Sequence, residues 1–254
     1  MSLPPTCPLI LLAEPRSGSS WLMQTMASHP RITMAGELLN PAAFPAAKTL
    51  QQIPAERYHE CIDYLERHCP AAENVAWSGC KVLFPHLEQV GAGFADALLE
   101  RMEERGGHCL FLTRRDLLAA RVSQDLARAS NRWHVLRGDS FEERTLALDP
   151  GTVWAQLDRS WKRRERLHSI VNARNVPTLS LEYEDLFQRP QFWLRRIAAF
   201  LDISARGFRP CNEVRGNPRP PGQVLSNYSQ VAQRLRLDPR FAPLVTQTAR
   251  RKDK

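Results

Sequence analysis

Hydrophobic residues occur along this chain in two patterns, short continuous runs and longer stretches with a spacing of three to four positions. The continuous runs predict buried strands, at residues 9–13, 109–113 and 177–181. The spaced stretches predict helices, at residues 19–28, 58–68, 94–104, 117–130, 156–172 and 192–201. Because strands alternate with helices, we expect an α/β fold with a central, mainly parallel sheet flanked by helices.

Two stretches show neither of these two hydrophobic patterns. Residues 40–54 contain three prolines and little periodicity, which predicts a loop or lid. Residues 209–223 are rich in proline, glycine and arginine and predict an irregular loop that contacts substrate or nucleotide. The chain has 254 residues, 43% of them hydrophobic, which is enough for a substantial core. We therefore expect a single domain over residues 1–254, with residues 249–254 as a flexible basic tail.

Charge and cysteine content narrow the classes of function. The formal net charge of +8 is typical of a protein with an anionic partner, whether nucleic acid, membrane lipid or a highly phosphorylated nucleotide. The six cysteines form no CxxC pair and no zinc-like spacing with histidine, so we expect buried thiols and no metal. The apolar run at 9–13 is too short for a signal peptide or a membrane span. These features predict a soluble, cytoplasmic protein with no integral membrane segment.

The most informative motif follows the first predicted strand, where residues 15–21 are Pro-Arg-Ser-Gly-Ser-Ser-Trp. Gly18 lets the backbone approach an anion, and the N–H groups that open the next helix point at it. Ser19 and Ser20 add hydroxyl donors, and Arg16 adds a permanent cation. A phosphate-like group is the expected ligand, although a serine-capped helix start is an alternative interpretation. The segment lacks the lysine of a Walker A loop.

This segment closely resembles the 5′-phosphosulfate loop of sulfotransferases that use 3′-phosphoadenosine-5′-phosphosulfate (PAPS). The family pattern is P-[KR]-S-G-[ST]-[ST], often followed by tryptophan. The resemblance implies the P-loop-nucleotide-kinase-like sulfotransferase fold. It also implies transfer of a sulfuryl group from PAPS to a hydroxyl, with release of PAP. The donor-binding residues implied by the match are Arg16, Ser17, Gly18, Ser19, Ser20 and Trp21.

A second segment resembles the family's 3′-phosphate site, R-x7-S. Arg115 lies at the end of a predicted strand, and Ser123 follows eight residues later in the next predicted helix. The helix brings Ser123 back beside the strand end, so that both residues could hold one phosphate. Arg114 is the alternative arginine for this contact.

Weaker similarities extend the match from about Leu9 to Gln233, except for residues 40–77. Residues 79–82, Gly-Cys-Lys-Val, resemble a G-x-K-[LV] strand of bacterial carbohydrate sulfotransferases. Residues 183–201 resemble a late family block, which we interpret as a strand end, a loop and a packing helix. Residues 225–228 resemble the family's C-terminal segment.

The catalytic base has two candidates. Gly36-Glu37-Leu38 resembles the trehalose and lipopolysaccharide-type bacterial enzymes, in which a glutamate after the loop helix is the proposed base. This implies Glu37 as the general base and favours a carbohydrate or glycolipid acceptor, with a phenol or a peptide tyrosine as alternatives. An exposed loop carboxylate is the other interpretation of Glu37. His86 is the rival base, and Arg16 is expected to stabilise charge on the leaving oxygen.

Two other classes of function remain as alternatives. A nucleotide kinase or NTPase of related architecture would need the missing Walker lysine. A basic nucleic-acid-binding protein is consistent with the arginines at 159–166, but that stretch includes Glu165, lacks a docking motif and predicts a solvated helix face. We expect no nucleic-acid partner. The sequence leaves the acceptor and the oligomeric state open.

Overall fold

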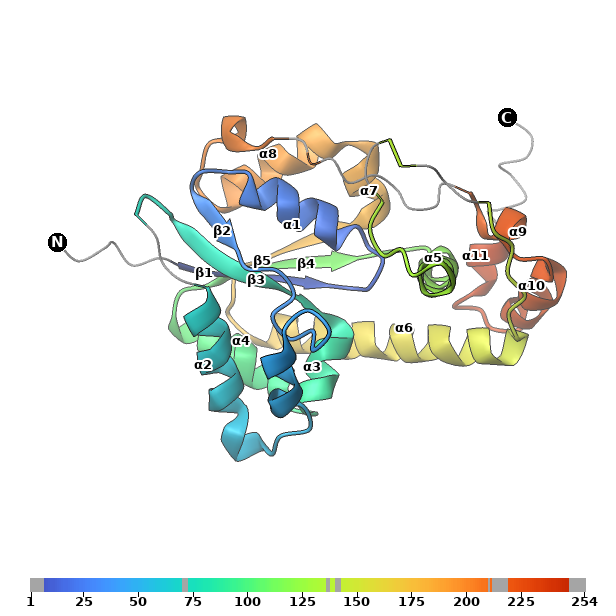
Figure 1. Ribbon diagram of the computed structural model, residues 1–254, viewed down its shortest axis with the longest axis horizontal. Coiled ribbons are helices and arrows are strands. Elements are labelled where there is room, and N and C mark those ends of the chain that lie inside the picture. The colour runs from blue at the N-terminus through green and yellow to red at the C-terminus, as the bar shows by residue number, and fades with distance from the viewer. Residues whose placement is uncertain are drawn as a thin grey trace. The chain divides into compact units, whose positions relative to one another are not determined.

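The structure is a computed structural model that describes residues 7–69, 73–135, 138–139, 143–209, 211 and 219–246 (Figure 1). Its contacts divide the chain into two compact units. Unit 1 comprises Met1–Thr113 and Arg164–Cys211, and unit 2 comprises Arg114–Arg163 and Asn212–Lys254. The expectation of one domain stays a prediction, and the units are described in turn.

Unit 1 is built on a five-stranded sheet in the order β2-β3-β1-β4-β5, with every neighbouring pair parallel. The strands are β1 (Cys7–Ala13), β2 (Ile32–Met34), β3 (Trp77–Leu83), β4 (His108–Thr113) and β5 (Thr178–Glu182). Because the strands are parallel, their carboxyl ends meet at one edge of the sheet. The predicted α/β fold with a parallel central sheet is therefore confirmed. In open sheets of this kind, ligands bind beyond that edge, where the strand order reverses.

Helices cover both faces of this sheet (Figure 1). One core joins α2, α3, α4 and the second half of α6 to the face that carries Ile10 and Leu12. The other core joins α1, α7 and α8 to the face that carries Leu9, Leu11 and Ala13. Burial on both faces explains why β1 is a continuous hydrophobic run. The helical elements involved are α1 (Ser19–Ala27), η1 (Pro45–Leu50), η2 (Ala55–Arg57), α2 (Tyr58–His68), α3 (Phe84–Val90), α4 (Phe94–Glu104), α6 (Pro150–Ala173), α7 (Tyr183–Gln188), α8 (Pro190–Phe200) and η3 (Ala205–Gly207).

Unit 2 has a helical core. It contains α5 (Leu117–Ser130), the first half of α6, α9 (Pro221–Val224), α10 (Tyr228–Arg236) and α11 (Ala242–Thr246). Asp116 caps α5 by accepting a hydrogen bond from the backbone N–H of Ala119 at 2.8 Å, which fixes the start of this helix. One isolated parallel bridge joins Leu146 to Leu225 in the described part of this unit.

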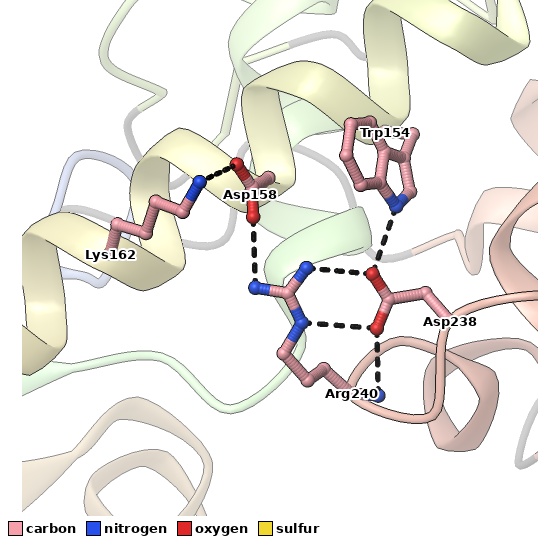
Figure 2. A network of polar contacts seen from close by, with 5 residues as sticks. All are labelled: Trp154, Asp158, Lys162, Asp238 and Arg240. Carbon is pink, nitrogen blue, oxygen red and sulfur yellow. Dashed lines mark hydrogen bonds and ion pairs between the residues drawn. The ribbon is translucent and has the colours of Figure 1, made fainter.

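A polar network in unit 2 ties the turn after α10 to α6 (Figure 2). The Arg240 guanidinium donates to both oxygens of Asp238, at 3.0 and 2.7 Å, and to Asp158 at 2.8 Å. Trp154 Nε1 donates to Asp238 at 3.0 Å, and Lys162 Nζ lies 2.8 Å from Asp158. Hydrogen bonds from Arg240 hold the pKa of Asp238 well below its usual range. The network satisfies two carboxylates at once, which gives the C-terminal helices of this unit a defined attachment.

Several predicted elements differ from the structure. Residues 183–186 form the first turn of α7 and not a strand end with a loop. Residues 45–50, expected to be irregular, form a 3₁₀ helix, and residues 221–223 open α9. The rest of the predicted loop at 209–223 lies mostly outside the described residues, as does the predicted tail.

The cysteines are all free thiols, but they are not uniformly buried. Cys61, Cys80 and Cys109 are buried, whereas Cys7, Cys69 and Cys211 are partly exposed, so the expectation of buried thiols is wrong for half of them. Within the described ranges, none of the helices has both the length and the apolar character that a membrane span requires.

Candidate active site

The loop between β1 and α1 has the backbone of an anion-binding turn. Arg16 and Gly18 adopt positive φ angles of 62° and 77°. A Cβ atom on Gly18 would lie 2.5 Å from Cε2 of Phe187, so only glycine fits there. Ser17 is fully buried and its hydroxyl donates to the carbonyl oxygen of Glu14 at 2.7 Å, which closes the turn from inside.

Gly18 is also the N-cap of α1, and no side chain caps this helix. The alternative interpretation of a serine-capped helix start is therefore wrong. The first-turn N–H groups of an uncapped helix lack partners within the helix and carry the positive end of its dipole. Ser19 is buried and Ser20 is partly exposed at the same turn. This arrangement fits an anionic group of phosphate or sulfate type.

A buried ion pair holds the base of this loop. Glu14, directly after β1, is 5% exposed and its two carboxylate oxygens accept hydrogen bonds from Arg164 on α6, both at 2.8 Å. Such two-point pairing fixes both side chains in one plane. The prediction that the arginines at 159–166 form a solvated face is therefore wrong for Arg164. The sequence gives no signal for this pair, because 150 positions separate its members.

Lys81 on β3 is the central cation of the site. It lies on the same face of the strand as Trp77 and Leu83, which pack in the core beneath α1. Its side chain is 2% exposed, and its Nζ atom lies 2.6 Å from Oε1 of Glu37 and donates to the Ser20 hydroxyl at 2.8 Å. Lys81 therefore connects the phosphate-type loop to the carboxylate. The sequence by itself assigns Lys81 no role, although residues 79–82 resemble a strand of the family.

Glu37 reaches Lys81 because its segment continues alongside β3. The N–H of Lys81 donates to the carbonyl oxygen of Gly36 at 2.8 Å. The side chain of Glu37 is 20% exposed, and its second oxygen accepts a hydrogen bond from Asn40 Nδ2 at 2.9 Å. The interpretation of Glu37 as an exposed loop carboxylate is therefore wrong.

The pKa of Glu37 reflects opposing effects. Burial by itself would raise it, but the charge of Lys81 and the hydrogen bonds from Lys81 and Asn40 together lower it below the ordinary glutamate value. The carboxylate is consequently ionised near neutral pH.

His86, the rival base, lies in the first turn of α3, 8% exposed. Its Nδ1 atom is buried without a hydrogen-bond partner among the described residues. Burial lowers the pKa of His86, the charge of Glu37 raises it, and the charge of Lys81 lowers it further. The net lowering favours a neutral imidazole at neutral pH. His86 is thus close enough to interact electrostatically with both members of the ion pair.

Trp21 lies on α1 with its ring centroid 5.1 Å from that of Phe187, which in turn lies 4.6 Å from Tyr183. The indole is partly exposed and packs against the core beneath α1. Trp21 therefore contributes to packing, and its role in binding the donor stays a prediction.

The residues predicted to hold a 3′-phosphate belong to unit 2. Arg115 is exposed and directly precedes the Asp116 cap of α5, whereas Ser123 lies in the second turn of that helix and is partly buried. Arg114 is partly buried. The assignment of these residues to one phosphate stays a prediction. In the described part of the chain, no group of three histidine, cysteine or acidic side chains is arranged to hold a metal ion.

Comparison with known proteins gives the family. No family model matches the chain. Nodulation protein H of Rhizobium tropici is 30% identical over 211 residues, 82% of this chain and 80% of that protein. Nodulation protein H of Rhizobium meliloti is 26% identical over 242 residues and 91% of each chain.

Two similar solved structures are also sulfotransferases. One is from Alicyclobacillus acidocaldarius, with a TM-score of 0.48 and 12% identity over 97% of each chain. The other is a mouse sulfotransferase complexed with PAP, with a TM-score of 0.43 and 15% identity over 78% of this chain and 60% of that one. On the identity and coverage of its curated relative, this chain belongs to the sulfotransferase family, together with nodulation protein H of Rhizobium tropici.

Proposed function

We propose that this sulfotransferase moves a sulfuryl group from PAPS to a hydroxyl of a carbohydrate or glycolipid and releases PAP. One observation carries the proposal: buried Lys81 contacts both Ser20 of the loop and the carboxylate of Glu37. An anion-binding turn and a potential base therefore share one cation. Membership of the sulfotransferase family supports this proposal over the nucleotide kinase, NTPase and nucleic-acid-binding alternatives.

The donor fits the chemistry of the loop. PAPS supplies the sulfuryl group, and its 5′-phosphosulfate suits the backbone N–H groups of the loop, that of Ser17 included, together with the hydroxyls of Ser19 and Ser20. Arg16 supplies a cation for the bridging oxygen, which gains charge as the bond to sulfur breaks. We assign the 3′-phosphate to Arg115 and Ser123, with Arg114 as the alternative. Sulfuryl groups carry less charge than phosphoryl groups, so we expect no metal.

We assign the proton transfer to Glu37. The acceptor oxygen forms a bond to sulfur, the bond to the nucleotide oxygen breaks, and the acceptor proton passes to the carboxylate. The resting ion pair keeps Glu37 ionised but makes it a weak base. An anionic sulfuryl group competes for the ammonium group of Lys81. When Lys81 turns toward that group, the pKa of Glu37 rises and its basicity increases where the proton must be accepted.

His86 is the second candidate for the base, and its buried Nδ1 without a partner favours it. A neutral imidazole can accept a proton directly. We also propose a cytoplasmic location, where the free thiols of this chain would stay reduced.

The proposal is tested with purified protein and radiolabelled PAPS. We expect label to pass to an oligosaccharide or glycolipid in preference to a phenol or a tyrosine peptide. Calorimetry should show that PAP binds more tightly than ADP, which lacks the 3′-phosphate. Equal affinity for the two nucleotides, together with no transfer to any hydroxyl, would overturn the choice of donor.

A further inference from the structure

The outer face of α8 carries an exposed aromatic residue. The helix buries Leu194, Ile197 and Ala198 against unit 1 and turns its opposite side to solvent. Phe192 on that side is 38% exposed. The large hydrophobic side chains exposed in the described part of the chain are Trp133, Phe192 and Leu237. The guanidinium groups of two arginines lie over the Phe192 ring.

Two arginines flank Phe192. The Arg189 guanidinium lies 5.2 Å from the Phe192 ring centroid, and that of Arg196 lies 5.9 Å from the same centroid and 5.1 Å from the ring of Trp193. These distances allow cation–π attraction, which holds the guanidinium groups beside the rings. Positions 189, 192 and 196 are three and four residues apart, so they form one stripe along the helix.

Among the residues that the structure describes, the arginines of this face have no acidic partner. No described carboxylate lies within ion-pair distance of Arg189, Arg195 or Arg196. Residues 189–209 contain five arginines and one acidic residue, Asp202, a net charge of +4. This is half of the chain's net charge of +8 in a short segment. Unpaired charge concentrated in this way favours an anionic partner.

We propose that the α8 surface, defined as Arg189, Phe192, Trp193, Arg195 and Arg196, docks the enzyme on an anionic lipid bilayer. A flat array of lipid phosphates complements arginines on a convex helix, and the Phe192 ring between them can enter the boundary between headgroups and acyl chains. A soluble polyanion would gain from the arginines but little from an exposed phenyl ring. The proposal concerns where the enzyme works and does not depend on its donor or acceptor.

The first test is sedimentation with phosphatidylcholine vesicles, with and without phosphatidylglycerol. We expect binding only with the anionic lipid, weakened by salt. The double variant Arg189→Ala/Arg196→Ala should lower the partition coefficient about 30-fold, because each basic residue near an anionic surface contributes about 1 kcal/mol. The matched control is Arg105→Ala/Arg236→Ala, which removes two exposed arginines elsewhere and gives the same net charge. A control that loses as much binding would show a general charge effect and overturn the docking surface.

The second test separates insertion of the ring from charge. Phe192→Ala should weaken vesicle binding without changing net charge, and Phe192→Trp should restore it. Neither substitution touches the candidate active site, so sulfate transfer to a soluble acceptor provides a check that the variants are folded. If the protein bound heparin or duplex DNA through the α8 arginines and did not sediment with anionic vesicles, the partner would be a soluble polyanion and the lipid assignment would be wrong.

Discussion

The Nζ atom of Lys81 lies 2.6 Å from Oε1 of Glu37, and the lysine is almost completely closed to water. At this distance each charge stabilises the other, so removal of one partner leaves a poorly solvated ion. The pair also joins two segments, the end of β3 and the turn after β2. We therefore expect substitution of either residue, or a change of pH, to alter the activity of the candidate active site.

Lys81→Met should raise the pKa of Glu37, because burial then acts without the opposing charge. A base must be ionised to act, so the acid limb of the kcat/KM profile should move to higher pH. In the wild type the lowered pKa contributes stability above about pH 4.3, the unfolded value, and this contribution disappears as pH falls through the folded value. Lys48→Met, an exposed lysine, is the control and should leave the profile unchanged. An unshifted limb in Lys81→Met would show that Glu37 does not govern the rate.

Glu37→Gln should lower kcat by about 10²–10⁴, because it keeps the shape of the side chain and one acceptor oxygen but removes the carboxylate that accepts the proton. The affinity for PAP should hardly change, since this residue is assigned to the acceptor. Transfer rates and PAP calorimetry measure the two effects. If Glu37→Gln kept near-normal transfer while His86→Ala abolished it, the histidine would be the base.

Arg16→Ala should lower turnover far more than PAP affinity, because its cation is worth most when the leaving oxygen gains charge. Steady-state kinetics and PAP binding measured on the same preparation separate these effects. A kcat reduced less than about threefold, with a strongly raised PAP dissociation constant, would make Arg16 a binding residue only.

Arg115→Ala should weaken PAP binding by about 1.5–3 kcal/mol, the scale of a charge-assisted hydrogen bond, and leave ADP binding unchanged. Arg114→Ala is the matched comparison, since it removes the same charge at the adjacent position. Whichever variant loses discrimination between PAP and ADP identifies the residue at the 3′-phosphate. No loss in either variant would refute the assignment of this site.

Gly18→Ala should abolish PAP binding and destabilise the fold, because the new Cβ would lie 2.5 Å from the Phe187 ring and the backbone has a φ angle of 77°. Gly106→Ala separates the two causes: its φ angle is 63°, yet no atom lies within 4 Å of the added Cβ. The control should therefore show only the backbone cost of about 1 kcal/mol. Thermal melts and PAP titrations provide the comparison, and equal behaviour of the two variants would argue against the steric role of Phe187.

Local signals in the sequence determined much of the fold. The helices 58–68, 94–104 and 117–130 have the predicted bounds, because hydrophobic spacing and helix-ending residues act within a few positions. Strand β1 was found for the same reason, as a run buried on both faces. The short strand β2 was missed, since three residues are too few to show a period. The candidate loop residues and Glu37 are predicted from motifs, which are also local, and their roles stay predictions.

Only the tertiary structure decided how these residues work together. Lys81 contacts Ser20 and Glu37 because β3 pairs with β1 and because the turn after β2 runs alongside β3. Both arrangements join residues that are far apart in the sequence. The sequence predicts Arg164 to be solvated, whereas in the structure α6 places it against Glu14. Contacts between side chains that are far apart in the sequence depend on how the whole chain packs. Local sequence patterns carry no information about that packing.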